Sequence, residues 1–393
     1  MGDLVNRITR KNQDLVSELP LTISAQYGLI DQNEFFDKRV ASKDVSGYYL
    51  IENGEFAYNK STSTDAPWGA IKRLDRYENG VLSTLYIVFG IKENNLVDSD
   101  FLVSYYSTNL WHKGIHEIAA EGARNHGLLN IAPADFFETK LMIPQDIEEQ
   151  KKIGKYFEEL DHLITLHQRK CDQTKNLKKY MLQKMFPQNG AKVPEIRFDG
   201  YTYDWEQRKL GDYLEVSKEK NRDEGFGKED VLSVSGEFGI VNQIEFQGRS
   251  FAGASVKNYG VVEVFDIVYT KSPLKSNPYG IIKTNKGKAG IVSTLYAVYK
   301  PKNNVDSEFI QIYFELDSRM NSYMHPLVNK GAKNDMKVSD ENALKGPVIF
   351  PRIEEQKMIS QYFSNLDHLI TLHQRKCDEL KKMKKYMLQN MFI

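Results

Sequence analysis

The sequence has few of the features that indicate a disulfide-rich, secreted or membrane protein. Only two cysteines occur among 393 residues, Cys171 and Cys377. We interpret them as small buried residues of a reduced protein rather than as metal ligands or a disulfide. No apolar run approaches the roughly 18 residues of a membrane-spanning helix, and the first residues do not resemble a signal peptide. We therefore expect a cytoplasmic protein with no membrane partner.

Motifs that hold nucleotides or metals are also missing. The sequence contains no G-x-x-x-x-G-K-[ST] loop, no dinucleotide-binding glycine fingerprint and no pair of C-x-x-C motifs. Asp135, Glu138 and Lys140 imitate a nuclease metal site, but the second half of the chain does not repeat them, so we interpret them as structural. His162 and His167 are five residues apart, off a common helical face, and are unsuited to sharing a metal. The sequence thus predicts no catalytic, metal or cofactor site and favours a recognition protein over an enzyme.

The most informative feature that is present is a duplication. Residues 160–172 and 366–378 both read LDHLITLHQRKCD, and they are identical at all thirteen positions. The tripeptide Glu-Glu-Gln precedes each copy, at 148–150 and at 354–356. A period of 206 residues is far longer than that of a solenoid repeat. We interpret the chain as a duplicated two-part module that presents one partner surface twice.

Each copy predicts one long helix of about 38 residues, with an acidic first turn and no proline until Pro187. Apolar or small residues recur alternately four and three positions apart, as in a coiled-coil seam. The predicted seam and subunit-docking residues are Ile153, Phe157, Leu160, Ile164 and Cys171 in the first copy, and Ile359, Phe363, Leu366, Ile370 and Cys377 in the second. An ordinary amphipathic core helix explains one copy equally well, but two matched copies favour pairing with each other. A second apolar face, with Leu163 and Leu177, leaves room for another partner.

The segments between the helices are duplicated more loosely. Pro67–Lys72 matches Pro278–Lys283, and Gly80–Tyr86 matches Gly290–Tyr296, whereas the sequences between these anchors differ freely. Strand-like runs alternate with loops, and no parallel βαβ pattern is evident, so we expect two α+β domains of one fold. The expected division is a first recognition domain at 1–146, a helix at 147–187, a second recognition domain at 188–352 and a helix at 353–393.

β-Branched and aromatic residues predict the individual elements of these domains. The expected strands are residues 48–50, 56–58, 82–89, 261–264, 267–270 and 291–299, and the expected helices are 100–107 and 307–322.

The charge pattern favours contact with nucleic acid in particular segments. Net charge is zero, which is unusual for a protein that binds nucleic acid alone. Residues 271–302, however, hold seven lysines and no acid, interleaved with tyrosines, which favours phosphate and base contact over a merely solvated surface. The candidate DNA-binding residues, from this segment and from polar stretches matched in both halves, are Lys60, Ser61, Lys72, Arg124 and Asn125 in the first half, and Lys271, Ser272, Lys275, Lys283, Lys333 and Asn334 in the second.

Over nearly its whole length the chain resembles the specificity (S) subunit of type I restriction–modification systems. The shared features are the alternation of divergent domain and repeated helix, the Glu-Glu-Gln-x-x-Ile helix entry and the Gly-Ala-Arg/Lys-Asn motif. The resemblance implies two target recognition domains, each reading one half of a bipartite double-stranded DNA site. It also implies helices that pair antiparallel with pseudo-two-fold symmetry, set the spacing of the half-sites and dock two modification subunits that methylate adenine. The alternative is a protein-interaction scaffold with two binding domains on a coiled-coil spacer.

The same resemblance assigns the chemistry to other subunits. S-adenosylmethionine, ATP and Mg²⁺ would be bound by modification and restriction subunits, and none by this chain. A heptad inserted after Thr174 and again after Leu380 is expected to lengthen the spacer.

One segment departs from the repeat. Pro194–Phe198 and Trp205–Leu210 lead into the second domain, whereas Gly2-Asp3 aligns with Gly211-Asp212, so the first domain has no counterpart to this lead-in. Either the lead-in is dispensable, or the numbered chain begins at an internal start.

Overall fold

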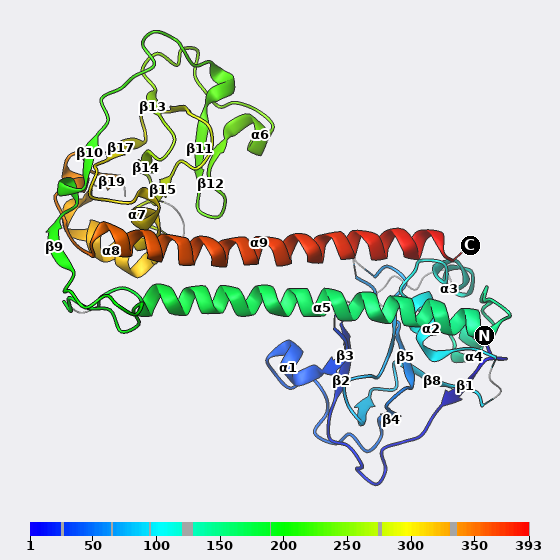
Figure 1. The fold of residues 1–393 in the computed structure, drawn as a ribbon. Coiled ribbons are helices and arrows are strands. Elements are labelled where there is room, and N and C mark those ends of the chain that lie inside the picture. Colours follow the sequence, from blue (N-terminus) through cyan, green and yellow to red (C-terminus); the bar gives the residue numbers. More distant parts are fainter. Residues whose placement is uncertain are drawn as a thin grey trace. The chain divides into compact units, whose positions relative to one another are not determined.

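The computed structural model describes residues 1–24, 27–63, 66–93, 96–119, 129–188, 190–273, 277–330 and 336–392. They form two compact units, which are Met1–Gln168 with Arg375–Ile393 (unit 1) and Arg169–Gln374 (unit 2). Each unit holds one α+β domain and part of both long helices (Figure 1), so the predicted fold class is confirmed. The boundaries of these units run through both long helices, because the units are defined by which residues pack together. The division into four consecutive segments that the sequence suggested is a different kind of division, and it stays a prediction.

Unit 1 is built on an antiparallel four-stranded sheet. Its order is β1-β8-β5-β6, formed by Val5–Ile8, Ile87–Ile91, Phe56–Asn59 and Ala70–Arg73. Two further strand pairs adjoin it, β2 with β3 (Leu21–Ser24 and Gly28–Asp31) and β4 with β7 (Tyr49–Glu52 and Asn79–Leu82). Alternate strand residues such as Phe56, Tyr58 and Phe89 are fully buried and form the centre of the core.

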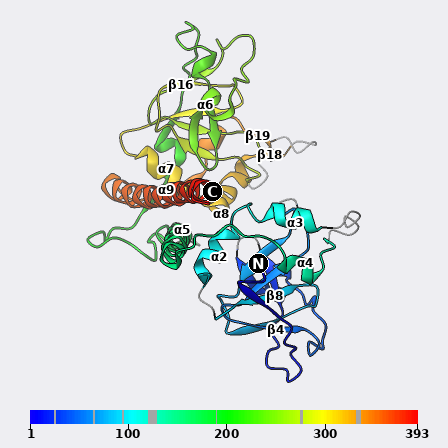
Figure 2. The ribbon, with the colours of Figure 1, turned by 90° about the vertical axis from the view of Figure 1, so that its right-hand side faces the viewer.

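Three short helices pack on this core (Figure 2), α2 (Ser99–Tyr105), α3 (His112–Ile118) and α4 (Pro133–Phe137). A further helix, α1 (Gln32–Phe36), follows β3 and buries none of its residues. Asp98 caps α2, because its carboxylate accepts a hydrogen bond of 2.9 Å from the Phe101 amide. The helices α2, α3 and α4 each contribute a buried side chain to the core, Phe101, Ile115 and Phe136 respectively.

Unit 2 repeats this topology strand for strand. Its sheet order is β10-β17-β14-β15, formed by Leu214–Val216, Ala297–Pro301, Ile267–Tyr269 and Ile282–Thr284. The adjoining pairs are β11 with β12 (Leu232–Ser235 and Gly239–Asn242) and β13 with β16 (Gly260–Val262 and Gly290–Val292). The helices are α6 (Gln243–Gln247), α7 (Ser307–Tyr313) and α8 (Asp317–Met324).

The described residues of unit 2 contain two further strand pairs. β9 (Glu206–Lys209) pairs with β20 (Pro347–Phe350), and β18 (Asn329–Lys330) pairs with β19 (Met336–Lys337). The 3₁₀ turns are Leu210–Asp212, Lys228–Asp230, His325–Leu327 and Asn342–Leu344.

The two long helices are α5 (Ile147–Lys184) and α9 (Ile353–Asn390), each 38 residues long, as the sequence predicts. They run antiparallel with the same register in both units. In unit 1 the Cys377 thiol lies 3.6 Å from the Gln168 side-chain oxygen, and in unit 2 the Cys171 thiol lies 3.8 Å from that of Gln374. Within the described ranges, no helix is long and apolar enough to cross a membrane.

Three predicted elements are wrong in their extent. The predicted strands 82–89 and 291–299 are each two strands, because a turn separates β7 from β8 and β16 from β17. The Tyr86 amide donates to the Ser83 carbonyl (3.1 Å) and the Tyr296 amide to the Ser293 carbonyl (3.0 Å), which closes these turns. The predicted helix 307–322 is likewise divided into α7 and α8. The Ser-Thr-Leu-Tyr turns contain none of the glycine, proline or asparagine that usually identifies a turn in a sequence.

Candidate nucleic-acid interface

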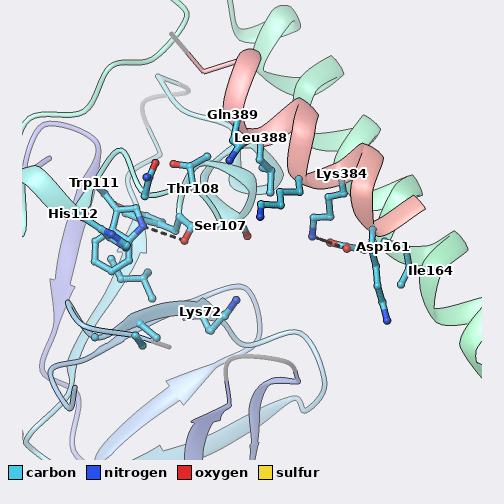
Figure 3. A pocket seen from close by; sticks show the side chains of 18 residues that line it. Lys72, Ser107, Thr108, Trp111, His112, Asp161, Ile164, Lys384, Leu388 and Gln389 are labelled. Carbon is cyan, nitrogen blue, oxygen red and sulfur yellow. Dashed lines mark hydrogen bonds and ion pairs between the residues drawn. The ribbon is translucent and has the colours of Figure 1, made fainter. Parts of the chain in front are cut away.

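A cleft of about 610 Å³ in unit 1 lies between strand β6, the segment leading into α3 and the last turns of α9 (Figure 3). Its charged lining consists of four lysines and one carboxylate, which are Lys72, Lys381, Lys384, Lys385 and Asp161. Ser107, Thr108, Asn109, Trp111, His112 and Gln389 contribute polar and aromatic groups. Cationic and hydrogen-bonding side chains in this combination suit a phosphate-bearing ligand.

Strand β6 and helix α9 position these lysines. Ile71 and Lys72 of β6 both line the cleft; Ile71 is buried in the core, and the side chain of Lys72 extends toward the cleft (Figure 3). On α9, Lys381, Lys384, Lys385 and Leu388 are spaced three and four residues apart and therefore share one helical face. The repeated helix thus supplies most of the positive charge, and the divergent domain supplies Lys72.

Charge inside the cleft is only partly neutralised. The Lys384 ammonium lies 2.6 and 2.7 Å from the two carboxylate oxygens of Asp161. Burial lowers the pKa of Lys72; the neighbouring Lys384 lowers it further, and Asp161 opposes the shift. Because four lysines face one carboxylate, an anion entering the cleft would relieve this repulsion.

The equivalent position in unit 2 is chemically different. Lys283 on β15 stands in place of Lys72, and Lys178 on α5 in place of Lys384. The Lys178 ammonium lies 2.7 Å from Asp367 and also 2.6 Å from Glu315, which occupies the position of Ser107. Glu315 thus gives Lys178 a second carboxylate partner that Lys384 lacks, and Lys283 is only 8% exposed. The lysine cluster of unit 2 therefore carries one more negative charge than that of unit 1.

Of the other predicted DNA-binding residues, those that the structure describes lie outside the cleft lining. Lys60 is half-buried, and burial lowers its pKa, while Ser61 is exposed and its amide donates a hydrogen bond of 2.9 Å to the Asn59 side chain. In unit 2, Lys271 pairs with Asp340 at 2.8 Å and Ser272 is exposed. Arg124, Asn125, Lys275, Lys333 and Asn334 lie outside the described residues.

Several lysines of the segment 271–302 have acidic partners. The fold brings acids from other segments to its lysines: Lys286 pairs with Glu308 at 2.9 Å and Lys300 with Glu219 at 2.7 Å. Its tyrosines are mainly core residues, since Tyr299 is 1% and Tyr279 is 7% exposed. Local charge counting missed partners that are remote in sequence.

The predicted seam residues are interior residues of the units. Ile153, Phe157 and Leu160 are buried in the core of unit 1, and Ile359, Phe363 and Leu366 in that of unit 2. Ile164 and Ile370 are half-buried, and both cysteines are fully buried. A docking partner could not reach most of these side chains without unfolding the unit. The seam residues therefore hold the helices and domains together.

A different face of the helices is exposed and apolar. We call it the helix stripe, and it comprises Leu163, Met383 and Tyr386 in unit 1 and Leu177, Tyr180, Leu369 and Leu372 in unit 2. Their side chains are 40–64% exposed, although leucine, methionine and tyrosine are usually buried on helices. Leu163 and Leu177 were noted in the sequence as a second apolar face, and the helix stripe extends that face to both copies.

Among the residues that the structure describes, no group of three or more His, Cys, Asp or Glu side chains is placed to hold a metal ion. Asp135 and Glu138 lie at α4, where Asp135 is in the first turn and Glu138 follows the last one.

The comparison with known families decides the identity. A profile described as "Type I restriction modification DNA specificity domain" matches residues 42–176 and again residues 203–382, once in each half of the chain. The chain belongs to this family. Its members provide the DNA specificity of type I restriction–modification systems and are not the catalytic subunits, in agreement with the resemblance seen in the sequence.

Individual relatives of this specificity subunit are distant. A putative type I restriction enzyme MjaX specificity subunit from Methanocaldococcus jannaschii is 24% identical over 371 residues, which covers 89% of this chain and 80% of that protein. The S subunit of a type I system from M. genitalium has a similar fold, with a TM-score of 0.56 at 13% identity, covering 100% of this chain and 94% of that chain. An HsdS subunit from Thermoanaerobacter tengcongensis gives a TM-score of 0.46 at 16% identity, with coverage of 100% and 95%.

Proposed function

We propose that each α+β domain of this specificity subunit reads one half of a bipartite double-stranded DNA site. The observation that carries the proposal is the basic cleft of unit 1, where the variable domain and the repeated helix contribute lysines to one opening. A phosphate held there would fix the register of the domain on DNA, while divergent loops contact the bases. The near-identity of the helices beside freely differing domains supports two readers with one common frame.

The helices, in this proposal, dock two modification subunits through the helix stripe. Its exposed leucine, methionine and tyrosine side chains resemble the apolar anchors that dominate protein interfaces. S-adenosylmethionine for adenine methylation, and ATP and Mg²⁺ for restriction, would be bound by the modification and restriction subunits. Such a complex would act on chromosomal and incoming DNA in the cytoplasm.

The proposal is tested by the salt dependence of DNA binding in the complex with modification subunits. Removing one lysine–phosphate interaction should reduce the slope of log affinity against log salt by about 0.9. We expect the double variant Lys381→Gln, Lys385→Gln to reduce the slope by about twice that amount. Lys382→Gln is the matched control, since Lys382 is exposed on the same helix but does not line the cleft.

Two outcomes would contradict this function. An unchanged slope for the double variant would show that the cleft does not contact DNA phosphates. A complex that binds DNA without sequence preference, and methylates no defined bipartite site, would instead favour an interaction scaffold. Methylome sequencing of cells that express the complex gives both half-sites and the gap between them.

A further inference from the structure

The lead-in of unit 2 covers a surface that its counterpart in unit 1 leaves open. In unit 2, β9 of the lead-in pairs along β20, with Arg208 opposite Val348 and Glu206 opposite Phe350. The matching residues of unit 1 are Lys140–Ile143, which form no strand, and the described part of unit 1 places no strand beside them. An open backbone edge of this kind is a template for an added strand.

Side-chain burial shows the same difference. Val348 and Phe350 are each 1% exposed beneath the lead-in. Their counterparts Leu141 and Ile143 are only half-buried, and Met142 is 75% exposed. Apolar side chains at an uncovered edge indicate a surface that is suited to an apolar partner.

The tryptophan of the lead-in identifies the second part of this surface. Trp205 packs on Phe186 and Phe309, with ring centroids 6.0 and 6.2 Å apart, and its indole nitrogen donates to Glu355 at 3.3 Å. The corresponding aromatic pair in unit 1 is Phe392 and Phe101, whose centroids are 5.6 Å apart. Both rings are present in unit 1, where Phe101 is fully buried and Phe392 is 8% exposed, and among the described residues of unit 1 no tryptophan lies on them as Trp205 does in unit 2.

The third part is a carboxylate. Glu355 is 2% exposed and receives two hydrogen bonds of 2.7 Å from Arg197 of the lead-in. Its counterpart at the same point of α5, Glu149, is exposed to solvent. A buried carboxylate requires such a cation, and Glu149 offers the same anchor to an arginine from elsewhere.

The point of entry is also reproduced. In unit 2 the Leu210 amide, at the end of the lead-in, donates to the Gly346 carbonyl at 3.0 Å. In unit 1 the Met1 nitrogen makes the equivalent contact to the Thr139 carbonyl at 2.6 Å. A groove of about 490 Å³ adjoins this edge and is lined by Met142, Phe392 and Tyr105 among others.

We propose that this surface of unit 1 is an acceptor for an extended polypeptide segment with the chemistry of the lead-in. Such a segment adds a strand along Lys140–Ile143, places a tryptophan in the groove beside Phe392, and directs an arginine to Glu149. Residues 192–210 are engaged within unit 2, so the lead-in of the same chain is not this segment. The inference rests on the difference between the two halves and does not depend on the DNA-binding proposal.

The test uses the full chain and a synthetic peptide with the sequence of Lys192–Leu210. Fluorescence anisotropy should show saturable 1:1 binding, and hydrogen exchange should show slowed amides at residues 140–143. A peptide with Trp205→Ala should bind at least about tenfold more weakly, as expected for a central aromatic anchor. Glu149→Gln in the chain should weaken the normal peptide, whereas Glu148→Gln, next to it and also exposed, should not.

A second measurement does not depend on affinity in trans. Fusing the sequence 192–209 directly ahead of Met1 should raise the melting temperature of the chain, and the same fusion with Trp205→Ala should raise it less. The proposal is overturned if the peptide does not bind. It is also overturned if protection appears only at residues 347–350, which would show exchange with the lead-in of unit 2.

Discussion

The side-chain oxygen of Gln150 accepts a hydrogen bond of 2.8 Å from the backbone amide of Asp98. The amide nitrogen of the same side chain donates to the carbonyls of Pro144 and Leu96. Gln356 repeats the arrangement with the Asp306 amide at 3.0 Å in unit 2. The third residue of the Glu-Glu-Gln motif therefore fastens the start of each long helix to the loop before α2 or α7.

Replacing Gln150 by leucine should destabilise the protein strongly. The substitution leaves the Asp98 amide and two carbonyls without their partner in a fully buried site, and each unsatisfied group costs about 1–3 kcal/mol. Urea unfolding should therefore show a loss of at least about 2 kcal/mol. Gln173→Leu, at an exposed position on the same helix, is the control and should change stability by less than about 0.5 kcal/mol. Equal effects of the two substitutions would refute the anchoring role.

At Gly154, helix α5 lies close against the backbone of α2. A Cβ atom there would lie 2.6 Å from the Phe101 nitrogen and 2.7 Å from the Asp100 carbonyl carbon, both of them backbone atoms. Alanine normally stabilises a helix by about 1 kcal/mol relative to glycine. At Gly154 the sign should reverse, and Gly154→Ala should cost about 1–3 kcal/mol by overpacking.

The matched control for this substitution is Gly47→Ala. No atom lies within 4 Å of a Cβ built at Gly47, so its effect on stability should be small. Thermal unfolding of both variants measures the difference. A stabilised Gly154→Ala variant would show that the helix does not pack this closely on α2.

Lys283 should give the stability of the domain a dependence on alkaline pH. Burial lowers the pKa of Lys283 below 10.5, and Glu315 opposes the shift. Between the lowered pKa and 10.5 the unfolded chain binds more protons than the folded one, so the free energy of unfolding contributed by this group rises with pH. Below the lowered pKa, burial of the charged ammonium is a constant penalty.

Lys283→Met removes both the cost of burying the charged ammonium and the pH dependence that this group gives to the free energy of unfolding. The variant should be more stable than the parent chain at neutral pH. The difference between their free energies of unfolding should become smaller as the pH approaches 10.5. Lys218→Met, at an exposed position of the same unit, should leave the gap constant. Urea titrations at several pH values measure these differences, and a gap that widens with pH would reverse the assigned sign.

The sequence predicts the helices and the duplication well because both are local or internally repeated properties. The two 38-residue helices follow from a periodic seam that is identical over thirteen positions. The basic cleft could only be predicted in part. Lys72 was predicted from its place in a matched stretch, whereas Lys381, Lys384 and Lys385 of the repeated helix were not among the predicted binding residues.

What sequence reasoning missed depends on tertiary contacts. The sequence around Lys271 and Lys300 does not predict their ion-pair partners. Asp340 and Glu219 lie 69 and 81 residues away from these lysines along the chain. The neutralising role of Glu315 likewise requires knowing that α7 ends beside Lys178. A comparison of Ser107 with Glu315 across the repeat was the available signal for the difference between the two clefts.

Subunit docking should depend on the helix stripe and not on the buried seam. Leu163→Glu and Leu369→Glu change side chains that are 40% and 42% exposed, so the folded chain should tolerate them. We expect the double variant to remain folded by circular dichroism yet to lose co-purification with modification subunits. By contrast, Leu160→Asp and Leu366→Asp place charges at positions 5% and 6% exposed and should unfold the chain. A folded stripe variant that still assembles would move the docking surface elsewhere.

The spacing between half-sites should follow the length of the paired helices, and the register identifies where to lengthen them. Gln168 lies level with Cys377 in unit 1, and Cys171 with Gln374 in unit 2. Insertions after Arg169 and Arg375 therefore fall between these two pairs and leave both of them unchanged. Insertions after Thr174 and Leu380, which the repeat alone suggested, fall inside the units, where the first would shift Lys178 away from Asp367.

A heptad inserted after both Arg169 and Arg375 preserves the seam and adds about 10 Å to each helix. At about 3.4 Å per base pair, the preferred gap should lengthen by about three base pairs, with both half-sites unchanged. Selection from a DNA library with fixed half-sites and variable gaps measures the preference by binding, so the result does not require that methylation survive. A heptad at Gly190, outside the helices, is the control and should leave the gap unaltered. Binding of the lengthened subunit to the original gap would show that the helices do not set the spacing.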